Sequence, residues 1–151
     1  MKCVFNIPRI AAKEWGNSDE KLKDTCVWIS ISEPNEQRTI VSNKYLDQLP
    51  KLKLALWDLT EPVKYKEETL MPPSEGDARK LVNFLVKHQD KIVICNCAAG
   101  ISRSGAIAQF CHDFLGHKWP DFYKEVAIPN STLYRLMVEY YTKNYLTKKD
   151  F

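Results

Sequence analysis

A cysteine and an arginine six positions apart stand where an apolar run gives way to a helical pattern. The apolar run that begins at Ile92 predicts a buried strand, and a helical pattern begins at Ser104. Between Cys97 and Arg103 lie mostly small residues: Ala98, Ala99, Gly100, Ile101 and Ser102. A strand, a short loop and a helix N-terminus bring backbone N–H groups together beside the positive end of the helix dipole. The sequence therefore predicts an anion-binding loop with a cysteine at its mouth.

The residue types in this loop suit nucleophilic attack on a phosphoryl group. A free thiol has a pKa near ~8.5, and a helix N-terminus with a neighbouring arginine lowers it to roughly 3.5–7.5, which Cys97 would experience. The planar fork of Arg103 matches two oxygens of a phosphoryl group. Gly100 permits a backbone conformation that turns N–H groups inward. Ser104 could donate a hydrogen bond to the sulfur when it leaves.

The rest of the chain predicts the elements that position this loop. Strands are expected at 3–7, 25–31, 51–57 and 91–96, and helices from Ser74, from Ser104 to Gly116 and over 131–146. A further helix could end at Leu49. Residues 59–73 are predicted to form a loop, and loops of this length in a compact domain usually have a functional role. Strands that alternate with helices predict an α/β fold with a central, mostly parallel sheet of about four to five strands and helices on both faces. The length predicts one domain, 1–151.

A carboxylic acid is expected beside the loop. The strand 51–57 runs directly into Asp58. In parallel sheets ligands bind beyond the carboxyl ends of the strands, so Asp58 and Cys97 should meet at one rim. Three nearby acids compete for the same role: Glu61, Glu75 and Asp77. Asp77 is better explained as a helix cap, because it lies three positions after Ser74.

The segment Cys97-Ala98-Ala99-Gly100-Ile101-Ser102-Arg103-Ser104 resembles the Cys-x5-Arg-Ser/Thr signature of the cysteine-based protein phosphatases. It is most similar to the dual-specificity branch and its small bacterial and phage-type relatives. The resemblance extends to 28–34 before the loop, and to Ile128-Pro129-Asn130 with Leu133 and Leu136 after it. It covers most of residues 25–140. The resemblance implies a dual-specificity phosphatase-like fold.

The resemblance also implies roles for single residues. Cys97 is similar to the nucleophile that forms a cysteinyl-phosphate, Asp58 to the general acid, and Arg103 to the residue that holds the phosphoryl oxygens with the N–H groups from Ala98 to Arg103. Asn130 stands where an asparagine supports the loop. No metal or other cofactor is required. The implied partners are a phosphorylated protein or peptide, and a phosphate or sulfate anion in the loop.

One residue departs from the family pattern. The family commonly has a histidine before the nucleophile, where this chain has Asn96. That histidine orders the loop and tunes the thiol, and Asn96 takes its place as a support of the loop. We expect activity to survive, because the helix dipole, the loop N–H groups and Arg103 remain. Cys95 reads as an inert core thiol, with a protective disulfide to Cys97 as the less favoured alternative.

Composition excludes few functions. The net charge of +3 is small and the lysines are scattered, so the sequence predicts no basic patch for nucleic acid, and nucleic acid is disfavoured as a partner. No apolar run has the length of a signal peptide core or a membrane span, and five cysteines suit a reducing compartment, so the expected location is the cytoplasm. The predicted function is a protein tyrosine or dual-specificity phosphatase. The alternatives are a phosphoprotein-binding module with little turnover and an RNA 5′-phosphatase.

Overall fold

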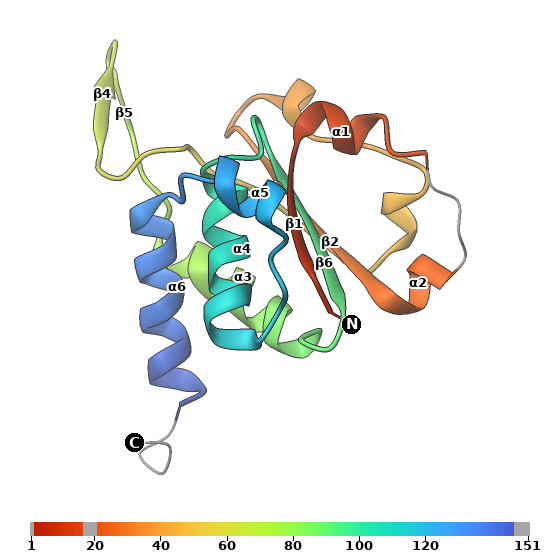
Figure 1. The fold of residues 1–151 in the computed structure, drawn as a ribbon. Helices are drawn as coiled ribbons and strands as arrows, with labels where there is room; N and C mark the ends of the chain where they lie inside the picture. Colours follow the sequence, from red (N-terminus) through yellow and green to blue (C-terminus); the bar gives the residue numbers. More distant parts are fainter. Residues whose placement is uncertain (1, 17–20, 147–151) are drawn as a thin grey trace.

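A four-stranded parallel sheet forms the centre of the computed structural model, which describes residues 2–16 and 21–146 (Figure 1). In spatial order its strands are β1 (Val4–Pro8), β6 (Ile92–Cys97), β2 (Cys26–Ser32) and β3 (Lys51–Ala55). All three strand pairs are parallel, which confirms the predicted sheet. Since β6 and β2 are central and covered on both faces, their sequences are almost continuously apolar. All four carboxyl ends lie at one rim, the top of the sheet in Figure 1.

Helices cover both faces of this sheet, as predicted (Figure 1). On one side lie α3 (Glu75–Lys87), α4 (Arg103–Leu115) and α6 (Ser131–Asn144), and on the other lie α1 (Arg9–Lys13) and α2 (Lys21–Thr25). Alternation along β2 feeds two cores: Val27 and Ile29 pack in the core of α3, α4 and α6, while Trp28 packs in the opposite one. Among the described residues, no helix is both long and apolar enough to span a bilayer.

The start of α3 and the C-terminal end of α4 lie where the sequence predicts them. The Ser74 hydroxyl accepts a hydrogen bond from the Asp77 N–H at 3.2 Å, and the Asp77 carboxylate accepts one from the Ser74 N–H at 2.8 Å. This capping box starts α3 and commits Asp77 to a structural role. Helix α4 stops at Gly116, whose φ of 77° is a left-handed cap that favours glycine.

The segment 59–73 is not the structureless loop expected from sequence. It contains an antiparallel hairpin of β4 (Val63–Tyr65) and β5 (Glu68–Leu70), which projects from the molecule at the upper left of Figure 1. Its turn places Lys66 at a φ of 56°, a conformation usually signalled by glycine or asparagine. Each strand has three residues and is largely exposed, so any alternation is too short to predict a strand.

Two smaller segments also differ from expectation. The linker after Gly116 holds a short helix, α5 (Asp121–Val126), which buries none of its residues and therefore leaves no apolar period in the sequence. The candidate helix before Leu49 is instead two single 3₁₀ turns, Gln37–Thr39 and Leu46–Gln48. Neither difference alters the rim at which the strands end.

Candidate active site

The segment from Cys97 to Arg103, here the cysteine loop, joins the end of β6 to the start of α4. Four of its carbonyls accept hydrogen bonds from outside: Ala98 from the Arg9 N–H (3.1 Å), Gly100 from Asn6 Nδ2 (2.8 Å), Ile101 from the Ile128 N–H (3.0 Å) and Ser102 from the Asn130 N–H (3.0 Å). In a trans peptide the N–H points away from the C=O. Outward carbonyls therefore leave the N–H groups facing the interior of the loop, where they can bind an anion.

Gly100 is the one position of the loop that excludes a side chain. Its φ is 73°, and a Cβ built there would lie 2.5 Å from the carbonyl carbon of Ile7 and 2.6 Å from the nitrogen of Pro8. The loop thus lies directly against the end of β1, where the buried side chain of Asn6 also donates to the Gly100 carbonyl. Both the backbone conformation and the space require glycine.

Gly100→Ala is expected to lower the free energy of unfolding by about 2 kcal/mol or more, because the left-handed φ and the clash with β1 add to each other. Urea denaturation followed by circular dichroism measures this change. Gly76→Ala is the matched control, since a Cβ there meets only Ser74 Oγ at an ordinary 3.6 Å. Gly76 lies in α3, so this control should be neutral or stabilising by up to about 1 kcal/mol. Equal effects of the two substitutions would contradict the geometry.

The Cys97 thiol is buried at the floor of the loop, with only 2% of the residue exposed. Its sulfur lies 3.1 Å from the Ser104 hydroxyl oxygen. Burial acts to raise the pKa of Cys97, but hydrogen bonds from the Ser104 hydroxyl and N–H, the charge of Arg103 and the Gly100 N–H outweigh it. The pKa of Cys97 is consequently lowered from the ordinary thiol value, which favours the nucleophilic thiolate.

Arg103 is held in place from two sides. Its Nη1 donates to the Leu56 carbonyl at 2.6 Å, and its Nη2 donates to Glu33 Oε1 at 2.7 Å. The residue is only 4% exposed, yet its buried Nε has no partner among the described residues. A buried guanidinium N–H normally finds an acceptor, and a bound oxyanion would supply one. Arg103 is therefore fixed in orientation, and its Nε–H is left for a ligand.

Asp58 lies against the cysteine loop, where the rim argument places it. Its Oδ1 accepts hydrogen bonds from the Ser102 hydroxyl at 2.6 Å and from Asn130 Nδ2 at 2.9 Å. Asp58 is exposed, so its carboxylate is open to solvent beside the loop. Two of the three competing acids lie elsewhere: Asp77 caps α3, and Glu75 lines a separate hollow.

Asn130 joins the loop, the acid and a helix. Its side-chain oxygen caps α6 by accepting from the Leu133 N–H at 2.9 Å, while its amide nitrogen donates to Asp58 and to the Leu59 carbonyl at 3.0 Å. Its backbone N–H donates to the Ser102 carbonyl. Asn130 thus contacts the cysteine loop through its backbone and positions Asp58 through its side chain.

Asn96 does not lie where a loop-supporting side chain was expected. Successive strand residues point to opposite faces, so Asn96 faces away from Cys97. Its Oδ1 accepts a hydrogen bond from Trp28 Nε1 at 2.8 Å on the α1 side of the sheet, and its buried Nδ2 has no partner within the described residues. Asn96 therefore stabilises the pairing of β6 with β2, and in the described structure its side chain makes no hydrogen bond to the cysteine loop.

Cys95 has the environment of a core thiol. It is fully buried, and its sulfur donates to the carbonyls of Phe5 at 3.4 Å and Ser104 at 3.5 Å. Burial raises the pKa of Cys95 well above the ordinary value, in the opposite direction to Cys97. All five cysteines are free thiols in the structure. The pKa values of the two β6 cysteines are thus shifted in opposite directions.

Among the residues that sequence reasoning missed, Glu33 and Asn6 contact the loop machinery through their side chains. Glu33, after β2, binds Arg103, and Asn6, in β1, donates to the Gly100 carbonyl while accepting from Trp119 Nε1 at 2.8 Å. The signal for Glu33 was present, because it follows a parallel strand just as Asp58 does. The only sequence signal for Asn6 is that it is a polar residue inside the predicted strand 3–7.

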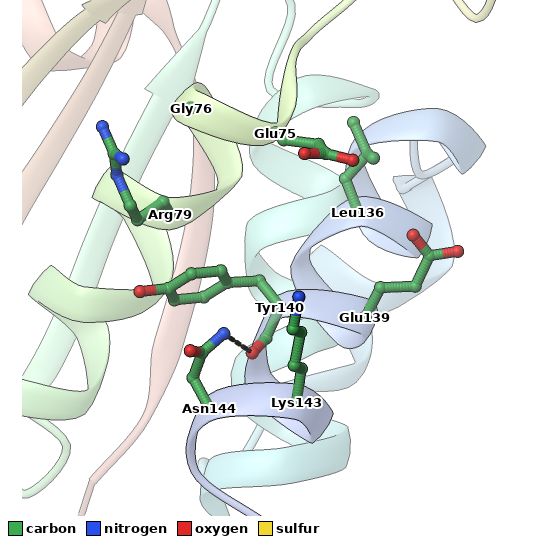
Figure 2. Close-up of a pocket in the computed structure, with 8 residues that line it drawn as sticks. All are labelled: Glu75, Gly76, Arg79, Leu136, Glu139, Tyr140, Lys143 and Asn144. Carbon is green, nitrogen blue, oxygen red and sulfur yellow. Dashed lines mark hydrogen bonds between the residues drawn. The ribbon is translucent and has the colours of Figure 1, made fainter.

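A separate hollow of about 530 Å³ lies between α3 and α6 (Figure 2). Its walls carry both signs of charge, with Arg79 and Lys143 beside Glu75 and Glu139, and Tyr140 between the two helices (Figure 2). None of its lining residues belongs to the cysteine loop. The hollow therefore takes no part in the geometry described above.

Neither a protein-family model nor a curated protein matches the chain. Solved structures do resemble it. Human tyrosine phosphatase-like serine/threonine/tyrosine-interacting protein superposes with a TM-score of 0.58 at 20% identity, covering 95% of this chain and 93% of the other. PTPMT1 in complex with PI(5)P gives 0.55 at 16% identity, covering 93% and 91%. DUSP15 gives 0.53 at 17% identity, covering 93% and 83%.

At these identities the likeness extends to the fold alone. It spans almost the whole chain, including the parallel sheet and the helices on both of its faces. The expectation of a dual-specificity phosphatase-like architecture is thereby confirmed. The chain has the dual-specificity phosphatase-like fold of the cysteine-based phosphatases.

Proposed function

We propose that the chain is a metal-independent phosphomonoester hydrolase that acts through a cysteinyl-phosphate, with phosphorylated protein side chains as substrates. One observation carries the proposal. The Cys97 sulfur, 3.1 Å from the Ser104 hydroxyl, lies in a loop whose carbonyls face outward. Beside it is the buried Arg103, whose Nε has no partner among the described residues. This arrangement offers a nucleophile and a set of donors to the same phosphoryl group.

In the first step the Cys97 thiolate attacks phosphorus in line with the ester oxygen. The P–S bond forms, the P–O ester bond breaks, and Asp58 gives its proton to the leaving oxygen. Arg103 and the loop N–H groups hold the three equatorial oxygens, on which negative charge is spread in the transition state. The products are the free alcohol or phenol and a cysteinyl-phosphate.

In the second step water hydrolyses this intermediate. Asp58, now a carboxylate, accepts a proton from the attacking water, the new P–O bond forms, and the P–S bond breaks. The Ser104 hydroxyl donates a hydrogen bond to the sulfur, stabilising it as a leaving thiolate. Inorganic phosphate leaves, and the enzyme returns to its starting state.

Phosphotyrosine, alone or together with phosphoserine and phosphothreonine, is the proposed target. The variable loop positions carry no positive charge: Ala98, Ala99, Ile101 and Ser102. A substrate with several phosphates would be expected to find basic residues there. Of the similar structures, PTPMT1 was solved with PI(5)P, so an inositol phosphate belongs in the test.

Phosphate release by the purified chain tests the function. We expect turnover of para-nitrophenyl phosphate and a phosphotyrosine peptide in the presence of EDTA, and slower release from inositol phosphates and 5′-triphosphate RNA. Tight binding of the phosphopeptide without release would instead support a phosphoprotein-binding module. Faster turnover of RNA or inositol phosphate would overturn the proposed substrate class.

Asp58→Asn is expected to lower kcat for a phenyl phosphate by about 10²–10⁴, the usual contribution of a general acid. The loss should be smaller with para-nitrophenyl phosphate, because its phenolate leaves without a proton. Glu61→Gln is the matched control and should keep the rate. Loss of the rate in Glu61→Gln with a normal rate in Asp58→Asn would reassign the acid.

A further inference from the structure

Glu33 is shared between two arginines at the rim of the sheet. Its Oε1 accepts from Arg103 Nη2 at 2.7 Å, and its Oε2 forms an ion pair with Arg9 Nη2. Each of the three residues follows the carboxyl end of a strand, and the three strands are adjacent in the sheet: Arg9 follows β1, Arg103 follows β6 and Glu33 follows β2. All three are largely withdrawn from solvent, with side chains 17%, 5% and 15% exposed respectively. Their interaction is consequently little screened by water.

We propose that Arg9 is a positioning residue for the candidate active site, acting on Arg103 through Glu33. This proposal rests on the proposed function only for its kinetic consequences. Arg9 is attached to the cysteine loop independently, because its backbone N–H donates to the Ala98 carbonyl at 3.1 Å. Its position is therefore set by the loop that it serves.

The charges explain why a second arginine is needed. A lone Glu33 beside Arg103 would cancel the charge of that guanidinium and weaken its hold on both thiolate and phosphoryl oxygens. With Arg9 on the other carboxylate oxygen, the cluster keeps one net positive charge while Glu33 still fixes Arg103. Burial acts to raise the pKa of Glu33, but the two arginines outweigh it and lower that pKa, so Glu33 stays ionised at neutral pH.

The charge around Cys97 comes from every element at the rim. The groups concerned are Arg103 and the Ser104 hydroxyl of α4, Asp58 after β3, Glu33 after β2, Arg9 at the start of α1, and the Cys95 thiol within β6. Changing Arg9 or Glu33 alters this charge by one unit in opposite directions. The Cys97 thiol can therefore report on both residues without any turnover.

The rate of Cys97 alkylation by iodoacetamide against pH tests the proposal. Arg9→Gln should raise the thiol pKa by about half a unit or more, Glu33→Gln should lower it, and the double variant should return near wild type. Arg9→Lys should leave it near wild type, because the charge is kept. A pKa unmoved by Arg9→Gln, or moved in the same direction by both single variants, would overturn the proposal.

Kinetics add a second reading of the same variants. Arg9→Gln should raise KM for para-nitrophenyl phosphate and the inhibition constant of inorganic phosphate about tenfold, with a smaller change in kcat, and Arg9→Lys should recover much of the loss. If Arg9→Gln does not fold, Arg9→Lys and Glu33→Gln still test the proposal. A shifted Cys97 pKa in Arg9→Lys, or an unshifted Cys97 pKa in Glu33→Gln, overturns it. Because alkylation needs no turnover, this failure is distinct from absence of phosphatase activity.

Discussion

Cys97→Ser is expected to lower phosphate release from a phosphotyrosine peptide by about 10⁵–10⁶, the scale seen when a covalent nucleophile is lost. A serine hydroxyl stays protonated in the environment that favours the thiolate of Cys97, so the attack in the first step fails. Binding should persist, because the loop N–H groups and Arg103 remain. Steady-state kinetics and peptide binding by calorimetry together measure this separation of turnover from affinity.

Cys3→Ser is the matched control for this substitution. Cys3 is a free, partly exposed thiol outside the cysteine loop, so its replacement should leave turnover unchanged. Equal turnover by Cys97→Ser and the wild type would remove the nucleophile from the proposal. Loss of turnover in both serine variants would show that the assay reports folding rather than chemistry.

Arg103→Lys is expected to reduce kcat/KM by about 10³–10⁵, the range for an arginine that stabilises a phosphoryl transition state. Lysine keeps the charge but has a single nitrogen. It cannot make the contacts of Arg103 with Leu56 and Glu33 and also replace the Arg103 Nε, which has no partner among the described residues, as a donor to a phosphoryl oxygen. Kinetics with the phosphotyrosine peptide measure the loss, and phosphate inhibition should weaken in parallel.

Arg135→Lys is the control for a change of arginine to lysine elsewhere. Arg135 forms an exposed ion pair with Glu139 on α6, at 3.0 Å and with both side chains more than half exposed. Such surface pairs contribute little to stability, so neither folding nor kinetics should change. An Arg103→Lys enzyme with nearly normal kcat/KM would show that Arg103 is a structural residue held by Glu33.

Local chemistry explains what could be predicted from the sequence. The cysteine loop, the capping box of Ser74 and Asp77, and the cap at Gly116 each depend on residues close together in the chain. Asp58 was predicted by one step more, from the rule that parallel strands end at a common rim. The structure brings it to Ser102 of the loop.

Pairings between distant segments explain what was missed. Applied to every strand, the same rim rule would have brought Glu33 and Arg9 beside Arg103. Nothing local shows that one carboxylate serves two arginines, because those contacts span 24 and 70 residues of sequence. The prediction that Asn96 supports the loop was wrong for another reason. Neighbouring strand residues face opposite sides of the sheet, so the residue before Cys97 points away from the loop.

Rapid acid quenching during turnover tests the central claim most directly. Wild-type protein is mixed with radiolabelled phosphotyrosine peptide, quenched within the first turnover, and the modified residue is located by mass spectrometry. We predict phosphate on Cys97 in the wild type, slower formation of this label in Asp58→Asn because the first step has lost its acid, and no label in Cys97→Ser. Release of phosphate without a labelled Cys97, or label on any other residue, would contradict a cysteinyl-phosphate mechanism.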